Sequence, residues 1–297
     1  MKVLNFGSLN IDYVYEMDHM VRKGETELAG SRNIFVGGKG LNQSIALGRA
    51  GVKVFHAGSV GEDGLFLLDT LKNADVDVSL VRILDDTASG HAIIQNDKDG
   101  DNCILLYGGA NQAISCEQID ETLSRFEKGD LLVLQNEVNN LSYIIDKAHD
   151  IGMQIVLNPS PYNSVIDGIN LEYVDYFFVN EIEAASLAGI EENDGEKLAG
   201  KLGEKFPAQK IILTLGTEGS FYIYGDEIVK QEVYKVKAAD TTAAGDTFSG
   251  YFIAEMIKGR SPKEALNTAA KASAIAVSRE GASPSIPTKS EVENYSF

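Results

Sequence analysis

The chain has 297 residues, 44% of them hydrophobic, and carries a formal net charge of −18 at pH 7. A chain of this length can bury a sizeable core in one large domain or two small ones. The negative charge argues against binding to nucleic-acid phosphates or to anionic membranes, although a small anionic ligand remains compatible with it. The two cysteines predict no disulfide framework, and the spacing of the four histidines predicts no zinc site. The lack of a signal peptide or of a membrane-length apolar run predicts a soluble cytoplasmic protein.

Short apolar runs that favour β-strands recur along the chain and alternate with amphipathic, helix-like segments. The runs are Val3–Phe6, Val52–Phe55, Leu131–Leu134, Ile155–Leu157, Tyr176–Val179 and Ile211–Leu215, and the helix-like segments include Ser115–Phe126, Leu141–His149 and Glu181–Leu187. This alternation predicts an α/β fold with a parallel sheet covered on both faces. Because no Pro-, Ser- or Gly-rich linker interrupts the pattern, we expect one domain over residues 1–297.

Four short strand-like segments stand outside this alternation. They lie at about residues 12–18, 31–37, 90–96 and 102–108, and an Asp-Gly turn joins the last two in a predicted hairpin. They could form a small separate sheet that acts as a lid over an α/β active site. They could equally be edge strands of the main sheet.

The segment Gly37–Gln43, with the sequence GGKGLNQ, precedes a predicted helix that runs to about Arg49. Its glycines allow close backbone approach to a ligand, while Lys39, Asn42 and Gln43 supply polar groups that suit a polyol. It is neither a P-loop nor a complete dinucleotide fingerprint. The alternative is a helix-start turn with a solvated lysine.

Asn180 and Glu183 open another helix directly after a predicted buried strand. Residues three apart share one side of the first helical turn, so the two side chains could hold Mg²⁺ largely through water. Asn followed three residues later by Glu is also the signature of a capping box, and the two interpretations are compatible. Further along, Thr214–Gly219 follows a strand as a turn that could pass over a nucleotide.

The segment Ala239–Gly250 places small residues directly before an apolar helix. Unpaired backbone N–H groups and the positive end of the helix dipole make such a helix start a site for an anion. Asp246 at this turn would repel a bound anion, but it would be useful as a base that takes a proton from a hydroxyl attacking a phosphoryl group. The alternative is an ordinary aspartate N-cap.

Taken in this order, these motifs resemble the ribokinase branch of the PfkB sugar-kinase family. The matching segments are Gly37–Gln43, Gly108–Ser115, Asn158–Pro161, Asn180–Glu183, Thr214–Gly219, Asp240–Gly250 and Ser278–Pro284. Asp240–Gly250 is the segment most specific for the family. The resemblance implies a three-layer α/β sandwich with a mostly parallel central sheet and a small β-sheet lid. It also implies transfer of the γ-phosphoryl group of ATP to a sugar hydroxymethyl group.

The resemblance assigns roles to individual residues. Asp246 would be the general base, and the anion hole would consist of the N–H groups of Ala243, Ala244 and Gly245. The sugar would bind, besides Asp246, to Asp12, Gly38, Lys39, Asn42 and Glu137. The nucleotide would lie along Asn180, Thr214, Gly216, Thr217, Gly219 and Gly245. Mg²⁺ would be held through water near Asn180 and Glu183, and K⁺ would bind a loop site formed by Asp240, Thr242, Ala276, Arg279, Gly281 and Ser283.

D-Ribose is the expected sugar, because the Asp12 carboxylate can accept hydrogen bonds from two neighbouring hydroxyls. Fructose, another ketose or deoxy-sugar, and a nucleoside are alternative acceptors. A catalytically silent sugar-binding regulator is a remoter alternative, since such a protein need not retain Asp246. His91 in the presumed lid could contact a further hydroxyl. Apolar residues on the lid strands also predict a homodimer formed through the lids.

Overall fold

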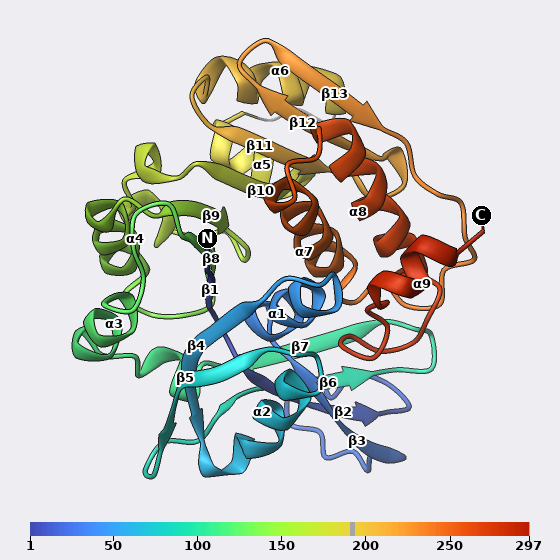
Figure 1. Ribbon diagram of the computed structural model, residues 1–297. Coiled ribbons are helices and arrows are strands. Elements are labelled where there is room, and N and C mark those ends of the chain that lie inside the picture. Colours follow the sequence, from blue (N-terminus) through green and yellow to red (C-terminus); the bar gives the residue numbers. More distant parts are fainter. Residues whose placement is uncertain (191–193, 297) are drawn as a thin grey trace.

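A nine-stranded sheet runs through the computed structural model, which describes residues 1–190 and 194–296. The strand order is β13-β12-β11-β10-β9-β8-β1-β4-β5 (Figure 1). The bounds are β1 Val3–Phe6, β4 Val54–Gly61, β5 Asp77–Leu84, β8 Leu131–Gln135, β9 Gln154–Asn158, β10 Tyr176–Asn180, β11 Lys210–Thr214, β12 Ser220–Tyr224 and β13 Glu227–Gln231. The strands from β11 to β5 pair in parallel, and β12 and β13 add an antiparallel edge.

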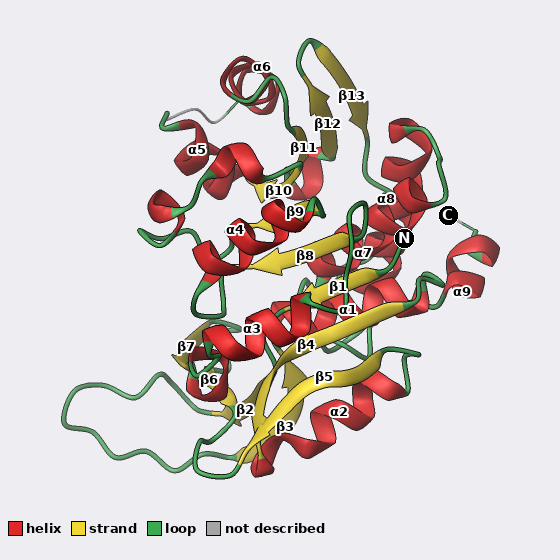
Figure 2. Cartoon of the chain, turned by 60° about the vertical axis from the view of Figure 1, so that its left-hand side comes forward, coloured by secondary structure: helices red, strands yellow, loops and turns green. Residues whose placement is uncertain are grey.

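Helices cover both faces of this sheet, as the turned view in Figure 2 shows. One face is covered by α1 (Lys39–Arg49), α2 (Leu65–Lys72), α7 (Ala244–Ile257), α8 (Pro262–Val277) and α9 (Lys289–Asn294). The other is covered by α3 (Cys116–Leu123), α4 (Leu141–Ile151), α5 (Glu181–Ala188) and α6 (Gly195–Lys205). Neighbouring residues of β8 point to opposite faces of the sheet. Val133 packs in the core under the first group of helices, and Leu132 packs in the core under the second group. Strands buried on both faces explain the continuous apolar runs in the sequence.

A second sheet of four strands lies at the lower right in Figure 1. Its order is β3-β2-β6-β7, with bounds β2 Asn10–Glu16, β3 Ser31–Gly37, β6 Gly90–Asn96 and β7 Asn102–Tyr107. Strand β2 pairs antiparallel with β3 and parallel with β6, and β6 and β7 form a hairpin. These strands coincide with the four segments outside the sequence alternation, and they form their own sheet instead of extending the large one. The predicted α/β fold class with a small additional sheet is therefore confirmed.

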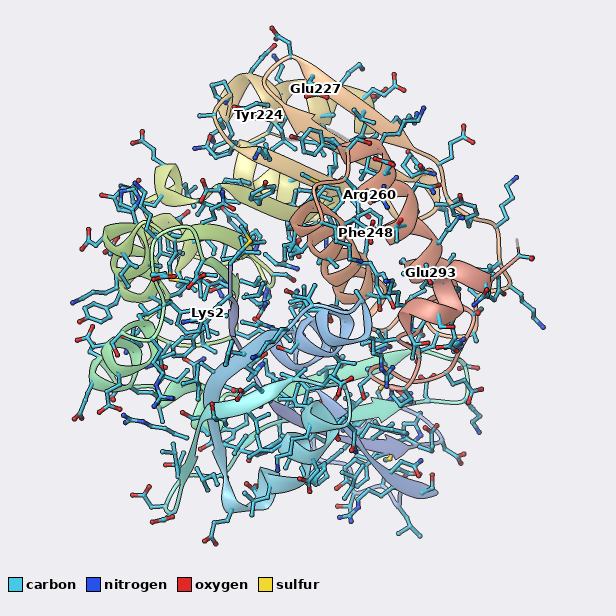
Figure 3. The ribbon with its side chains drawn as sticks, in the orientation of Figure 1. Lys2, Tyr224, Glu227, Phe248, Arg260 and Glu293 are labelled. Atoms are coloured by element: carbon cyan, nitrogen blue, oxygen red, sulfur yellow. The ribbon has the colours of Figure 1, made fainter. Side chains whose placement is uncertain are left out.

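The apolar runs in the sequence missed three strands of the large sheet. Strand β5 is a half-buried edge strand that carries Asp77, Ser79 and Arg82, so its apolar content is diluted. Strands β12 and β13 form an edge hairpin, whose turn is flanked by Tyr224 and Glu227 (Figure 3). Five 3₁₀ turns complete the described elements, at Glu62–Gly64, Gly109–Gln112, Ile166–Gly168, Leu171–Tyr173 and Gly216–Glu218. None of the helices in the described ranges combines the length and the apolar character needed to cross a membrane.

Candidate active site

The N-terminus of α7 presents Asp246 at the carboxyl ends of the central strands. Ala243 is the N-cap residue, with a left-handed backbone at φ 59°, and Asp246 is the third residue of the helix. The alternative that Asp246 is an N-cap is therefore wrong. Its carboxylate is buried and accepts two hydrogen bonds, from Asn42 Nδ2 at 3.1 Å and from Gln43 Nε2 at 3.0 Å. The side chain is thus held as an oriented acceptor.

The predicted anion hole lies on the same turn. The N–H of Ala244 donates to the Thr241 carbonyl at 3.2 Å, which closes the turn that precedes α7. The N–H groups of Ala243 and Gly245 find no acceptor within the described part of the chain. Free N–H groups at the positive end of a 14-residue helix can bind a phosphoryl oxygen.

A second group of charged residues lies beside Asp246: Lys39 and Glu137 interact electrostatically with it, and Asp12 lies close to Glu137. Burial and the nearby Glu137 raise the pKa of Asp12 to about 7. Burial is also the main reason why the pKa of Glu137 lies above its ordinary value. Burial would lower the pKa of Lys39, but the carboxylates of Asp246, Glu137 and Glu183 outweigh it, so this pKa is raised. Lys39 is therefore the cation that balances the charge of these three carboxylates.

The turn that begins α1 fixes the position of Glu137. Gly38 takes φ 94°, a conformation that suits glycine, and the N–H of Lys39 then donates to Glu137 Oε2 at 2.9 Å. The Ser8 hydroxyl donates to the same carboxylate oxygen and accepts from the N–H of Gly40. By contrast, no donor within residues 1–190 and 194–296 reaches the Asp12 carboxylate. A sugar hydroxyl is a suitable missing donor.

An open cavity of about 200 Å³ lies in front of α7, between the ends of the strands. Its lining includes eight of the predicted site residues: Lys39, Asn180, Glu183, Thr214, Ala243, Ala244, Gly245 and Asp246. Asn158, Ser160 and Ser249 also line it, although the sequence reasoning did not name them as site residues. The signal for Asn158 and Ser160 was the Asn-Pro-Ser-Pro turn at the end of β9.

Asn180 and Glu183 form the capping box that their spacing allows. Asn180 Oδ1 accepts from the N–H of Glu183 at 2.9 Å, and Glu183 Oε2 accepts from the N–H of Asn180 at 3.0 Å. Both residues line the cavity, and Glu183 is buried. The capping role and a role toward a metal are compatible, because Glu183 Oε1 makes no hydrogen bond to any described group.

Only part of the segment that follows β11 lines the cavity. Thr214 lines the cavity, whereas Gly216 and Thr217 are exposed in a 3₁₀ turn beside it. Gly219 has φ 100°, and a Cβ there would lie 2.2 Å from the Gln231 carbonyl oxygen. A backbone constraint is therefore sufficient to explain this glycine.

The loops predicted to hold a monovalent cation lie against each other. Asp240 accepts from the N–H and hydroxyl of Thr242 and from the N–H of Gly281. Burial would raise the pKa of Asp240, but these hydrogen bonds outweigh it and lower the pKa. The carbonyls of Ala276 and Ser283 already accept, from the N–H of Arg279 and from Arg49 Nη1, and the Arg279 side chain pairs with Glu291.

His91 points away from the Asp12 side of the small sheet. Cross-strand partners share a face, and His91 pairs with Ile11 and Tyr107, whereas Asp12 pairs with Ala92. The imidazole contacts the rings of Tyr13 and Tyr107, and its Nδ1 lies 3.1 Å from the Ser89 carbonyl oxygen. We therefore assign His91 to sheet packing and not to the sugar.

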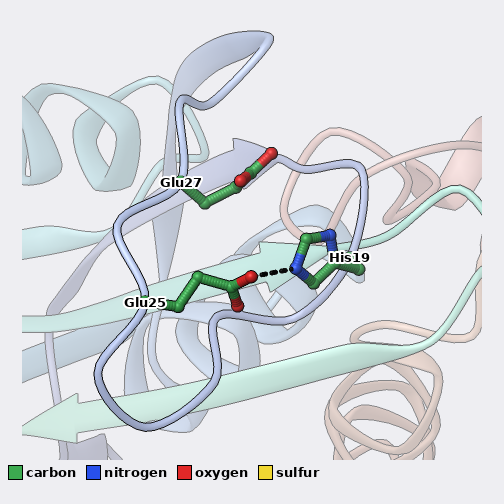
Figure 4. A group of neighbouring side chains, drawn as sticks. All are labelled: His19, Glu25 and Glu27. Atoms are coloured by element: carbon green, nitrogen blue, oxygen red, sulfur yellow. Dashed lines mark hydrogen bonds and ion pairs between the residues drawn. The ribbon is translucent and has the colours of Figure 1, made fainter.

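Three potential metal ligands gather in the connection between β2 and β3, as Figure 4 shows. His19 Nε2 lies 2.9 Å from Glu25 Oε1, and Glu27 lies beside this pair. The other oxygen of Glu25 accepts from the N–H of Arg22. A hydrogen bond between His19 and Glu25 that closes a surface loop is sufficient to account for this group.

The fold and the site together define a phosphotransferase of the carbohydrate-kinase type, with a buried carboxylate at a helix N-terminus beside a glycine-rich turn. Residues 1–289 match the model of the pfkB family carbohydrate kinases, and the chain belongs to that family. It is 33% identical to a ribokinase of Staphylococcus aureus, with 98% of both chains covered.

Two solved structures are similar over the whole fold. The ribokinase of Cryptococcus neoformans in complex with ADP has a TM-score of 0.86 and 32% identity, with 98% of each chain covered. The ribokinase of Arabidopsis thaliana complexed with ribose and ATP has a TM-score of 0.87 and 26% identity, with 99% of each chain covered.

Proposed function

We propose that this chain transfers the γ-phosphoryl group of ATP to the hydroxymethyl oxygen of D-ribose and forms ribose 5-phosphate. The observation that carries the proposal is the buried Asp246 carboxylate, oriented by two amide donors at the N-terminus of α7. The similarity to ribokinases over the full length supports the choice of sugar and of nucleotide.

Asp246 acts as the general base in this proposal. As the O5 oxygen of ribose attacks the γ-phosphorus, its proton passes to the Asp246 carboxylate, and the bond from phosphorus to the bridging oxygen of ADP breaks. The N–H groups of Ala243 and Gly245, with Ala244 on the same turn, stabilise the charge on the transferring phosphoryl oxygens.

The sugar binds between the small sheet and α1. Asp12 accepts hydrogen bonds from neighbouring ribose hydroxyls, and Glu137 and Lys39 contact other hydroxyls. Asn42 Oδ1 is a buried acceptor without a partner among the described residues, which suits a further hydroxyl donor. Gly38 allows the sugar to approach the backbone. The small sheet then serves as a lid that excludes water.

The nucleotide binds along Thr214, Gly216, Thr217 and Gly219, with its phosphates directed toward α7. Asn180 and Glu183 fit Mg²⁺ held through water, since Glu183 keeps one carboxylate oxygen available beside the cavity. Mg²⁺ supplies charge neutralisation for the phosphates.

The paired loops fit a monovalent cation such as K⁺ in part. Asp240, Thr242 and Gly281 are close enough to share hydrogen bonds, which supports one compact site near the start of α7. The carbonyls of Ala276 and Ser283 would first exchange their present donors.

A homodimer through the lid follows from the exposed apolar residues of the small sheet. On β7, Ile104, Leu105, Leu106 and Tyr107 are all more than half exposed, and on β3 Ile34 and Phe35 are also exposed. Leu105, Tyr107 and Ile34 share the face turned away from Asp12, and a second copy of the chain would cover that face.

The experiment that tests the proposed function is a panel of acceptors with ATP and Mg²⁺, with ADP release as the readout. We expect D-ribose to have a higher kcat/KM than 2-deoxy-D-ribose, D-fructose or a nucleoside. A tenfold preference for fructose or a nucleoside, about 1.4 kcal/mol in transition-state binding, would overturn the assignment of ribose and leave the kinase chemistry intact.

A further inference from the structure

Behind Asp246, a row of buried polar side chains continues into the large sheet. Its members are Gln43 and Ser44 of α1, Gln135 at the end of β8, Asn5 of β1 and His56 of β4, and none of them is more than 1% exposed. The three strands are neighbours in the order β8-β1-β4. Of this row, only Gln43 contacts the proposed base.

Hydrogen bonds join the row without a break. Gln43 Nε2 donates to Asp246 Oδ1 at 3.0 Å, and Gln43 Oε1 accepts from Gln135 Nε2 at 2.7 Å. Gln135 Nε2 also donates to Asn5 Oδ1 at 3.0 Å. Asn5 Nδ2 donates to the Gly40 carbonyl and to the Ser44 hydroxyl, both at 2.8 Å. Ser44 Oγ in turn lies 2.7 Å from His56 Nδ1.

The Gly40 carbonyl determines the direction of every amide in this chain of hydrogen bonds. A backbone carbonyl can only accept, so Asn5 must present its NH₂ to Gly40 and its oxygen to Gln135. Gln135 must then present its NH₂ to both Asn5 and Gln43. If Gln135 were flipped, its oxygen would face two other oxygens. Gln43 is left with one orientation, in which its NH₂ points to Asp246.

His56, at the far end of this row of hydrogen bonds, does not change the orientations of the amides. Burial lowers the pKa of His56 to about 4, so its imidazole is neutral near neutral pH. Gln135 Oε1 has no partner among the described residues, which is the cost of using its NH₂ twice. A buried acceptor left without a donor is unfavourable, so packing alone does not account for this arrangement.

We propose that Gln135 is a positioning residue for phosphoryl transfer, which acts through Gln43 to keep the Asp246 carboxylate aimed at the sugar hydroxyl. The inference rests on the proposed role of Asp246 as the base, but it does not depend on which sugar is the acceptor. Gln135 itself touches neither of the proposed substrates. If Gln135 is removed, the Gln43 amide can turn its oxygen toward Asp246, and the carboxylate then loses a hydrogen bond that aligns it.

The test is Gln135→Met, which keeps the volume and removes the hydrogen bonds. Gln118→Met is the matched control, because Gln118 is also buried and forms hydrogen bonds with Gly58 and Ser59, but it does not belong to the row that leads to Asp246. Both variants are measured with the acceptor of highest kcat/KM in the panel. We expect Gln135→Met to lower kcat about tenfold or more relative to Gln118→Met, with the sugar KM changed less than about threefold.

A further readout separates positioning from a loss of folding. The double variant Gln43→Met/Gln135→Met is no slower than Gln43→Met alone, since Gln135 acts through Gln43.

Equal kcat values for Gln135→Met and Gln118→Met, at matched thermal stability, would overturn the proposed positioning role. Additive losses in the double variant would also overturn it. An enzyme that prefers another sugar to ribose refutes only the choice of sugar. A chain that phosphorylates no acceptor in the panel refutes both proposals.

Discussion

Asp246 is the residue on which the proposed chemistry depends most. Asp246→Asn keeps the size of the side chain but cannot accept a proton, and its NH₂ would face the NH₂ groups of Asn42 or Gln43. We expect kcat to fall by about 10²–10⁴, the range for loss of a general base, with the KM for ATP little changed. Steady-state kinetics checks this. Activity above about a tenth of the wild-type value would mean that Asp246 only orders the turn.

Asp12 gives the sugar site a dependence on pH. Because its pKa is raised to about 7, the carboxyl is mostly protonated below that pH and ionised above it. Sugar hydroxyls donate to the ionised form, so the sugar KM should fall about tenfold as the pH rises from about 6 to about 8. The ATP KM serves as the internal comparison. A sugar KM with the same pH dependence in Asp12→Asn would contradict this account.

Some of the site could be predicted from neighbouring residues, and some could not. Asp246, Ala243 and Lys39 lie in short motifs whose backbone chemistry is local. The contacts of Gln43 with Gln135 and of Gln135 with Asn5 span 92 and 130 positions. No spacing in the sequence shows such pairs, because the sheet topology brings them together.

At the scale of elements, α5 combines a capping box with a proposed metal site. Asn180→Ala/Glu183→Ala removes both, so we expect the Mg²⁺ concentration for half-maximal activity to rise about tenfold or more. The capping loss alone should cost about 1 kcal/mol of stability.

The matched control for α5 is the capping box of α8, formed by Ser261 and Glu264 outside the cavity. Ser261→Ala/Glu264→Ala should lower the thermal stability by a similar amount and leave the Mg²⁺ titration unchanged. If both double variants give the same Mg²⁺ titration, Asn180 and Glu183 are a helix cap and no more.

The elements differ in how clearly the sequence shows them. Strands buried on both faces, such as β8 and β11, produce continuous apolar runs and were located within one or two residues. The edge strand β13 has only two apolar residues, Ile228 and Val229, between Glu227 and Lys230, and resembles a polar turn region. An edge strand is harder to predict from apolar runs, because it pairs with a neighbouring strand along one edge only.

At the scale of the whole molecule, the exposed β7 strand predicts a dimer. Leu105 is 65% exposed on the small sheet, and Leu105→Glu would place a charge in the proposed interface. We expect the wild-type protein to sediment as a dimer at micromolar concentration and the variant to sediment as a monomer. Val165→Glu, at a site 50% exposed outside the small sheet, is the control and should remain dimeric. A wild-type monomer would remove the lid interface from the account.

The identity of the sugar-phosphate product tests the central claim most directly. The protein is incubated with ATP, Mg²⁺ and ¹³C-labelled D-ribose, and the product is followed by ³¹P and ¹³C NMR. The account predicts one phosphate ester with phosphorus coupling at C5, formed in step with ADP. A phosphate ester at C1, or release of inorganic phosphate without a sugar phosphate, would contradict it.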